Sequence, residues 1–199
     1  MRRLSMEVTV SGSLPNSNLV VSNHLSYLDI LFYASLVPCI FVSKSEVLSW
    51  PLFGILARCG GTIFVERNRA HGVDEPAREI TDALTAGVPV VLFPEGTSTD
   101  GRTVLPFRTA LLQPAIATRT PIRPAAISYS LVDGVEADLC YHGEVTFLPH
   151  LFGALAHKRL EARIAFEDEA PVYSDRKTAA KAAWQRVVSL RDSKPVFTS

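Results

Sequence analysis

Short apolar runs alternate along the chain with longer segments that mix apolar and polar residues, and this alternation is typical of an α/β domain. The apolar runs predict strands at Leu19–Val21, Cys39–Val42, Thr62–Val65, Val88–Phe93, Ile122–Ser128 and Arg163–Phe166. The mixed segments predict helices at Leu28–Leu36, Leu52–Cys59, Asp74–Ala86, Thr109–Thr118 and Thr178–Arg191. Because Val88–Phe93 is apolar almost throughout, we expect a central strand that is buried on both faces. We also expect Pro124 to break the strand in which it lies.

The chain contains no internal repeat, no low-complexity tract and no linker that would divide it. We therefore expect one domain over residues 1–199, built on a mixed, mostly parallel central sheet flanked by helices. The motif-bearing core is expected at about residues 15–165, with a C-terminal strand and helix within residues 160–192.

Polar residues cluster where three of the predicted strands end. The clusters are Ser22–His24, Glu66–Asn68 and Glu95–Ser98. Ligands of α/β sheets bind outside the carboxyl ends of the strands. The sequence therefore predicts one site that is assembled from several loops.

The first cluster contains a histidine, His24, that is followed five residues later by Asp29. A carboxylate bonded to one imidazole nitrogen fixes the tautomer and stabilises the imidazolium formed when the other nitrogen takes a proton. Residues five apart do not share a helix face, so the pair requires His24 in the turn before the helix. The alternatives are structural: Ser26 and Asp29 have the spacing of a helix capping box, and His24 could be an ordinary buried histidine.

The other two clusters contain groups suited to binding a polar head group. Gly96 permits unusual backbone conformations, and Glu95 could position a hydroxyl or a basic group. Arg67, at the end of a strand, suits bidentate contact with a phosphate. An ordinary polar turn and a solvated surface arginine are the alternatives.

Composition and spacing narrow the function classes. The formal net charge is +0, so no nucleic-acid partner is expected. The three cysteines are far apart, which is typical of a reducing compartment, and neither they nor the histidines have metal-ligand spacing. A hydrolase that pairs His24 with a serine nucleophile is disfavoured because no G-x-S-x-G elbow is present; its candidate nucleophiles are Ser22, Ser26 and Ser98.

Four segments taken together are far more specific than any one of them. Asn23–Asp29, Gly61–Asn68, Phe93–Ser98 and Ile122–Ile127 closely resemble, in order and separation, the blocks of the bacterial PlsC-type glycerolipid acyltransferases. This family contains the 1-acylglycerol-3-phosphate acyltransferases. Tyr141–Phe147 also resembles a downstream segment of some bacterial members. The resemblance implies a glycerol-3-phosphate acyltransferase-like fold.

The same resemblance implies a role for each matched residue. His24 is similar to the family's general base and Asp29 to its orienting partner. Pro124 is similar to a position tied to acyl binding and to structure. The positions that resemble the acceptor-binding residues, or lie beside them, are Asn23, Arg67, Glu95, Gly96 and Thr97. Backbone N–H groups near His24 or Gly96 are candidate donors to a tetrahedral oxyanion.

The resemblance implies transfer of a fatty acyl group from acyl-CoA or acyl-acyl carrier protein to a lysophospholipid hydroxyl. The expected acceptor is 1-acyl-sn-glycerol-3-phosphate, and a lyso-ornithine lipid is the alternative. An acyl thioester is already activated, so neither a metal nor a cofactor is expected. A non-catalytic lipid-binding module that keeps the fold is the alternative from another class.

A lipid substrate implies a membrane surface as partner, at the cytoplasmic face of a bacterial inner membrane, with peripheral or monotopic attachment. The family's usual apolar segment before the histidine block has no match in the residues before His24, which are largely polar. Either the start of the sequence is trimmed or this member docks without that segment. In the second case we expect membrane contact through apolar faces of Ile30–Val42 and Trp50–Leu56.

Overall fold

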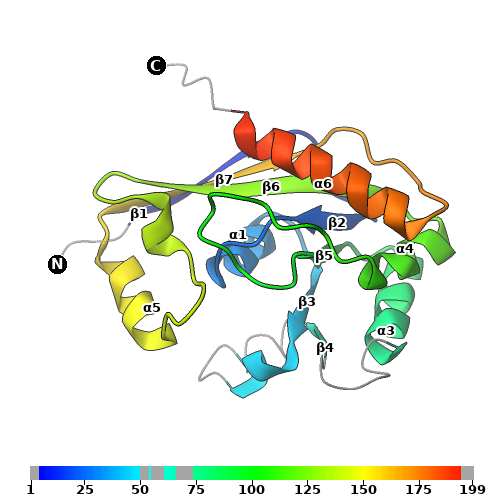
Figure 1. Cartoon of the computed structure of the whole chain (residues 1–199), viewed down its shortest axis with the longest axis horizontal. Helices are drawn as coiled ribbons and strands as arrows, with labels where there is room; N and C mark the ends of the chain where they lie inside the picture. Colours follow the sequence, from blue (N-terminus) through cyan, green and yellow to red (C-terminus); the bar gives the residue numbers. More distant parts are fainter. Residues whose placement is uncertain (1–4, 50–53, 55–60, 66–73, 194–199) are drawn as a thin grey trace.

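The fold is organised by a seven-stranded sheet in which β2, β3, β4, β5 and β6 run in one direction and β1 and β7 run in the other (Figure 1). The computed structural model describes residues 5–49, 54, 61–65 and 74–193. The strand order is β1-β7-β6-β2-β5-β3-β4, and β6 and β7 form the antiparallel pair. The strands are β1 Ser5–Ser11, β2 Leu19–Ser22, β3 Ile40–Lys44, β4 Ile63–Val65, β5 Val90–Leu92, β6 Ile122–Leu131 and β7 Arg159–Phe166. This is the single α/β domain with a mixed, mostly parallel sheet that the sequence predicts.

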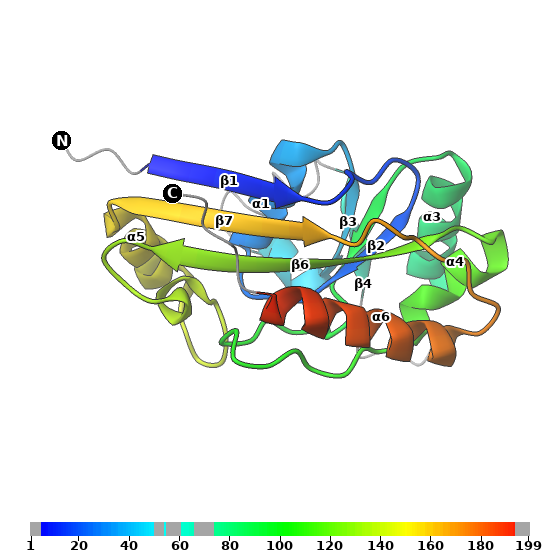
Figure 2. The ribbon, with the colours of Figure 1, turned by 90° about the horizontal axis from the view of Figure 1, so that it is seen from above.

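Helices cover both faces of the sheet. The helices are α1 Leu28–Leu36, α3 Asp74–Thr85, α4 Gln113–Thr118, α5 Phe147–Ala156 and α6 Arg176–Asp192. Short 3₁₀ turns lie at η1 Ser45–Ser49, η2 Ala110–Leu112 and η3 Glu136–Leu139. α1 and α5 contribute to the core on one face, and α3, α4 and α6 contribute to the core on the other (Figure 2). α5 lies at the opposite end of the molecule from α3 and α4 (Figures 1 and 2).

The central strands are apolar because both of their faces are buried. In β2, Val20 packs into the core that contains α1, whereas Leu19 and Val21 pack into the opposite core, and all three are fully buried. In β5, Val91 and Val90 divide in the same way. The prediction of a central strand between residues 88 and 93 is confirmed, because β5 pairs with β2 on one side and β3 on the other.

Pro124 does not break its strand, and that prediction is wrong. β6 runs without interruption from Ile122 to Leu131. Pro124 pairs with Val21 of β2, and the ladder with β7 begins one residue later at Ala125. Proline lacks an N–H group, and it is tolerated at this end of the pairing with β7, where its carbonyl accepts from the N–H of Glu167 at 2.9 Å.

Two elements are absent from the sequence prediction. β1 pairs in parallel with β7 at the edge of the sheet, and most of its residues are exposed. α5 is an apolar helix in a region for which no element is predicted. The predicted helix Thr109–Thr118 is instead η2 followed by α4, with Pro114 near the start of α4. The predicted helix Leu52–Cys59 lies outside the described residues.

The apolar segment Ile30–Val42 is mainly a core element. Phe32, Tyr33 and Phe41 are at most 5% exposed, and Leu31 is its large apolar side chain that faces solvent, at 42%. The expected membrane face on this segment is therefore reduced to one residue, and Trp50–Leu56 lies almost entirely outside the described residues. Across the part of the chain that is described, no helix combines the length and the apolar character needed to cross a bilayer.

Candidate active site

Two of the three polar clusters meet at one edge of the sheet. β2 and β5 are adjacent and parallel, with Val21 opposite Leu92, so the loops that follow them lie side by side. The backbone N–H of His24 donates to Glu95 Oε1 at 2.7 Å, which joins the two loops directly. The third cluster, with Arg67, falls on residues that the structure does not describe.

His24 is held from four directions. Its Nδ1 lies 2.7 Å from Asp29 Oδ2, and its ring stacks on Phe93 with 4.3 Å between ring centroids. Its backbone N–H is bound by Glu95, and its carbonyl accepts from Thr99 N at 3.0 Å. The side chain is 21% exposed, so a substrate can reach the ring. With Nδ1 bound to Asp29, Nε2 is the nitrogen that can take a proton.

Asp29 is the fully buried anchor of this arrangement. It lies in the first turn of α1, where the helix dipole favours a negative charge. Its Oδ2 also accepts from the backbone N–H groups of Leu25 at 2.8 Å and Ser26 at 3.2 Å. Its Oδ1 accepts from the hydroxyl of Tyr129. The predicted placement, with the histidine in the turn and the carboxylate in the first turn of the helix, is confirmed.

The alternative reading as a capping box is half fulfilled. Asp29 binds the N–H of Ser26, as the reciprocal bond of a capping box would. The Ser26 hydroxyl is buried and has no hydrogen-bond partner among the described residues. The carboxylate therefore supports the turn and the imidazole at the same time, while the serine does not cap the helix.

Glu95 is 3% exposed, and both of its oxygens bind backbone N–H groups. Oε1 accepts from His24 and Oε2 from Leu105, each at 2.7 Å. Burial raises the pKa of this carboxyl group above its usual value, although both hydrogen bonds oppose the shift. The observed contacts position the His24 turn, and binding of the acceptor by Glu95 stays a prediction.

The other predicted site residues lie close by but differ in exposure. The side chain of Asn23 is buried and exchanges two hydrogen bonds with the backbone of Ile127, which ties the end of β2 to β6. Gly96 has φ +73°, a conformation that favours glycine, and Thr97 is exposed beside it. Pro124 is buried in β6. Substrate contacts by these residues stay predictions.

The expected oxyanion donors are already engaged. The N–H groups of Leu25 and Ser26 bind Asp29, and that of His24 binds Glu95. The N–H of Gly96 donates to the carbonyl of Phe93 at 3.0 Å. These amides build the turn, and in this arrangement they are not free to stabilise an oxyanion.

Two of the three candidate serine nucleophiles are hydrogen-bonded to other groups, and the third is buried. Ser22 Oγ accepts from the Tyr33 hydroxyl at 2.8 Å, and the Ser98 hydroxyl donates to the carbonyl of Tyr141. Ser26 is fully buried. This geometry favours the use of His24 as a base toward an incoming hydroxyl over activation of a serine of this chain.

Sequence reasoning missed two neighbours of the pair. Phe93 supports the imidazole ring, and Tyr129 binds Asp29 from a position 100 residues away. Phe93 ends the apolar run that precedes Glu95, so its place beside the site follows from β5. No local pattern marks Tyr129, because its partner is fixed only by the pairing of β6 with β2.

Known proteins resemble this chain over most of its length. The Acyltransferase family model matches residues 6–128. A lyso-ornithine lipid O-acyltransferase of Rhizobium meliloti is 34% identical over 203 residues, which cover 92% of this chain and 69% of that protein. A 1-acyl-sn-glycerol-3-phosphate acyltransferase of Neisseria meningitidis serogroup B is 32% identical over 152 residues, which cover 76% of this chain and 60% of that protein.

The fold is also similar to that of a solved structure. The 1-acyl-sn-glycerophosphate (LPA) acyltransferase PlsC from Thermotoga maritima matches with a TM-score of 0.65 at 23% identity, over 96% of this chain and 74% of that one. The family model covers more than half of this chain, and the His24–Asp29 pair stands in the matched region. The chain therefore belongs to the PlsC-type acyltransferase family.

Proposed function

We propose that this protein is a lysolipid O-acyltransferase that uses His24 as general base, and that its acceptor is a lyso-ornithine lipid. The observation that carries the reaction type is the 2.7 Å contact between His24 Nδ1 and the buried Asp29. The acceptor is supported by the wider similarity to the lyso-ornithine enzyme, which covers 92% of this chain against 76% for the Neisseria enzyme. The acceptor expected from the sequence, 1-acyl-sn-glycerol-3-phosphate, becomes the second candidate.

The proposed reaction needs one base and an activated acyl donor. His24 Nε2 takes the proton of the lipid hydroxyl as its oxygen attacks the thioester carbonyl carbon. The resulting imidazolium is stabilised by Asp29 through Nδ1. When the tetrahedral intermediate collapses, the carbon–sulfur bond breaks and the thiolate takes the proton back from His24. The products are an ester and a free thiol, and the base is regenerated.

An acceptor screen with a matched histidine control tests this proposal. The purified protein would receive acyl-CoA or acyl-acyl carrier protein together with lyso-ornithine lipid, 1-acyl-sn-glycerol-3-phosphate or glycerol 3-phosphate. We expect the highest kcat/KM with lyso-ornithine lipid, and a loss of about a hundredfold or more in His24→Ala. His157→Ala is the control, because His157 also contacts an aspartate, Asp133, at 3.1 Å but lies at the C-terminal end of α5 and makes no contact with the His24–Asp29 pair.

The outcomes separate the competing functions. A slow acyl transfer that is unchanged in His24→Ala would indicate a non-catalytic lipid-binding module. A covalent acyl-serine trapped by mass spectrometry would indicate the hydrolase-like alternative. Preference for 1-acyl-sn-glycerol-3-phosphate would restore the first expected acceptor. Arg67→Ala should chiefly raise the acceptor KM, since an arginine fork suits a phosphate or carboxylate head group.

We propose that the protein meets its lipid at a membrane surface partly through α5. Leu148, Phe152 and Leu155 are 54%, 67% and 53% exposed, and their spacing places them on one side of the helix. The first turns of α5 pack against the His24 turn: Tyr27 contacts His150 at 3.0 Å and stacks edge-on with Phe147. This apolar stripe therefore lies on a helix that packs beside the candidate site.

Liposome flotation tests the membrane contact. We expect Phe152→Ser combined with Leu155→Ser to reduce vesicle binding several-fold, because exposed apolar area drives interfacial binding. Val172→Ser is the matched control, because Val172 is 54% exposed in the connection between β7 and α6. Equal binding by both variants would count against α5 as the contact.

A further inference from the structure

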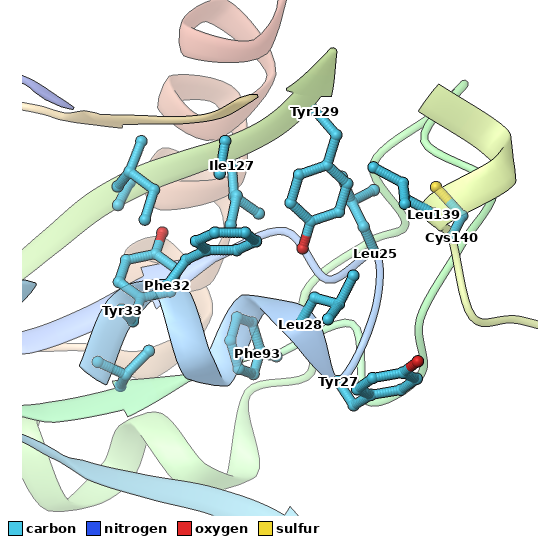
Figure 3. Packing of buried hydrophobic residues seen from close by; sticks show 14 of the residues in the cluster. Leu25, Tyr27, Leu28, Phe32, Tyr33, Phe93, Ile127, Tyr129, Leu139 and Cys140 are labelled. Atoms are coloured by element: carbon cyan, nitrogen blue, oxygen red, sulfur yellow. The ribbon is translucent and has the colours of Figure 1, made fainter. Parts of the chain in front are cut away.

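The aspartate of the candidate site has a second partner that no sequence block contains. Tyr129 lies in β6 and is 6% exposed, and its hydroxyl is hydrogen-bonded to Asp29 Oδ1. Figure 3 shows the Tyr129 hydroxyl pointing toward the N-terminal part of α1. Oδ2 faces His24, Leu25 and Ser26, so the two carboxylate oxygens have separate sets of donors.

The direction of this hydrogen bond is fixed by chemistry. Burial, and next the negative charge of Asp29, raise the pKa of the Tyr129 phenol well above its ordinary value of 10. The phenol therefore keeps its proton and donates a hydrogen bond to the carboxylate. A donor on Oδ1 prevents rotation of the carboxylate and leaves Oδ2 facing the imidazole.

Tyr129 is itself held firmly. Its backbone N–H donates to Glu136 Oε1 at 2.8 Å, and Glu136 is paired with Arg191 of α6 at 2.8 Å. Arg191 also donates to the backbone carbonyl of Ile127, in the same strand. On the ring side, Tyr129 packs against Phe32 of α1 with 5.8 Å between centroids. These contacts fix both the strand and the ring, and they therefore hold the hydroxyl beside Asp29.

We propose that Tyr129 is a positioning residue for acyl transfer: its hydroxyl holds Asp29 in the orientation in which the carboxylate fixes the tautomer and the direction of His24. This inference rests on the proposed function of His24 as general base. The ionisable groups near Asp29 are His24, Tyr129, Glu95, Tyr33, Cys140 and Arg191. Among the described residues of this group, His24 and Tyr129 are the two whose side chains are hydrogen-bonded to the carboxylate.

The chain offers a matched control for Tyr129→Phe. Tyr33 is fully buried in the same core, and its hydroxyl donates to Ser22 Oγ at 2.8 Å. Tyr33→Phe therefore removes one buried hydroxyl and one hydrogen bond without touching the carboxylate. Both variants should lose similar stability, so a difference between them in catalysis isolates the contact with Asp29.

Steady-state kinetics across pH, with thermal unfolding of each variant, test the proposal. In Tyr129→Phe we expect kcat to fall about tenfold with the acceptor KM nearly unchanged, because a transition-state orientation is lost. We also expect the acid limb of kcat/KM to move to higher pH by about half a unit, since Asp29 then presents more charge to the imidazole. Tyr33→Phe should stay within about threefold of the parent at all pH values.

A second substitution keeps the test decisive if Tyr129→Phe folds poorly. Incorporation of 3-fluorotyrosine at position 129 keeps the hydroxyl and strengthens it as a donor, so the acid limb should move in the opposite direction. An unmoved acid limb in both variants, or equal rate losses in Tyr129→Phe and Tyr33→Phe, would overturn the proposal. If His24→Ala also retains full activity, the proposed function fails as well; if it is inactive, only the role of Tyr129 fails.

Discussion

The two faces of the sheet are buried equally well but with different chemistry. The core on the side of α1 and α5 is rich in aromatic residues, among them Phe32, Tyr33, Phe93 and Tyr129 (Figure 3). The core on the side of α3, α4 and α6 is mainly aliphatic, and Phe107 is the aromatic residue among its buried described members. Among the described residues, it is the first face that also buries an aspartate next to an imidazole.

The difference shows how one domain can separate stability from chemistry. Tyrosine and histidine rings fill space as aliphatic side chains do, but they also present a hydroxyl or a nitrogen at a fixed place. On the aromatic face these groups satisfy a buried carboxylate, which would otherwise be costly. The aliphatic face carries no such group among its core members and can be expected to support the fold alone.

Asp29→Asn should produce the largest effect. The amide keeps the shape but has one acceptor oxygen where the carboxylate uses two, and without the negative charge it no longer stabilises an imidazolium. We expect kcat to fall about a hundredfold or more, and the free energy of unfolding to fall by about 3 kcal/mol. Acyl-transfer kinetics and urea unfolding measure the two losses.

A rate unchanged in Asp29→Asn would contradict the assignment of chemistry to the aromatic face. A stability loss without a rate loss would reduce Asp29 to a structural anchor of the turn.

Ile80→Ala sharpens the comparison from the other face. Ile80 of α3 is fully buried in the aliphatic core, so its truncation should lower the free energy of unfolding by about 2–5 kcal/mol. The rate per folded molecule should stay within about twofold of the parent, because no contact of the His24 turn is lost. Unfolding titrations and active-site-normalised kinetics would check both values.

A large rate loss in the folded Ile80→Ala protein would show that the two faces are coupled. The separation between a stabilising and a chemical face would then not hold.

Glu95→Gln should have the smallest effect, which is a change in how the free energy of unfolding depends on pH. The folded pKa of Glu95 is raised, so its stabilising contribution is complete below the unfolded value, near 4.3, and is lost as pH rises through the folded value. Relative to Glu95→Gln, the parent should therefore lose free energy of unfolding as pH rises from about 4. Unfolding measured at several pH values checks the sign.

The exposed glutamate Glu169, changed to Gln, corrects this comparison for the loss of one negative charge. If the parent instead gained free energy of unfolding relative to Glu95→Gln as pH rises, the two backbone hydrogen bonds would outweigh the cost of burying the charged carboxylate.

The local sequence was sufficient to predict the elements whose structure is decided by burial alone. β2 and β5 are recognisable because strands buried on both faces must be apolar, and their adjacency brings the His24 and Glu95 loops together. The contact between His24 and Asp29 follows from a turn and the start of a helix, which are local. The effect of Pro124 could not be predicted in this way, because whether the strand tolerates a proline there depends on where the pairing with β7 begins.

The remaining features depend on contacts between distant segments. α5 is apolar on an exposed side, so its periodicity does not separate a buried face from a solvent face. β1 is largely exposed and is stabilised by pairing with β7 across the length of the chain. Glu95 is read locally as a polar loop residue, yet its carboxylate is buried between two backbone amides.

The position of β2 in the sheet has a consequence for biosynthesis. It leaves the ribosome well before both of its neighbours, β5 and β6. Until these have been made, a strand that is apolar except for Ser22 has two open edges, which invites pairing with other nascent chains. Since Tyr129 follows Asp29 by 100 positions, the hydrogen bonds of Asp29 cannot be completed until residue 129 has been made. We infer that folding helpers that shield short extended segments would raise the yield of this protein.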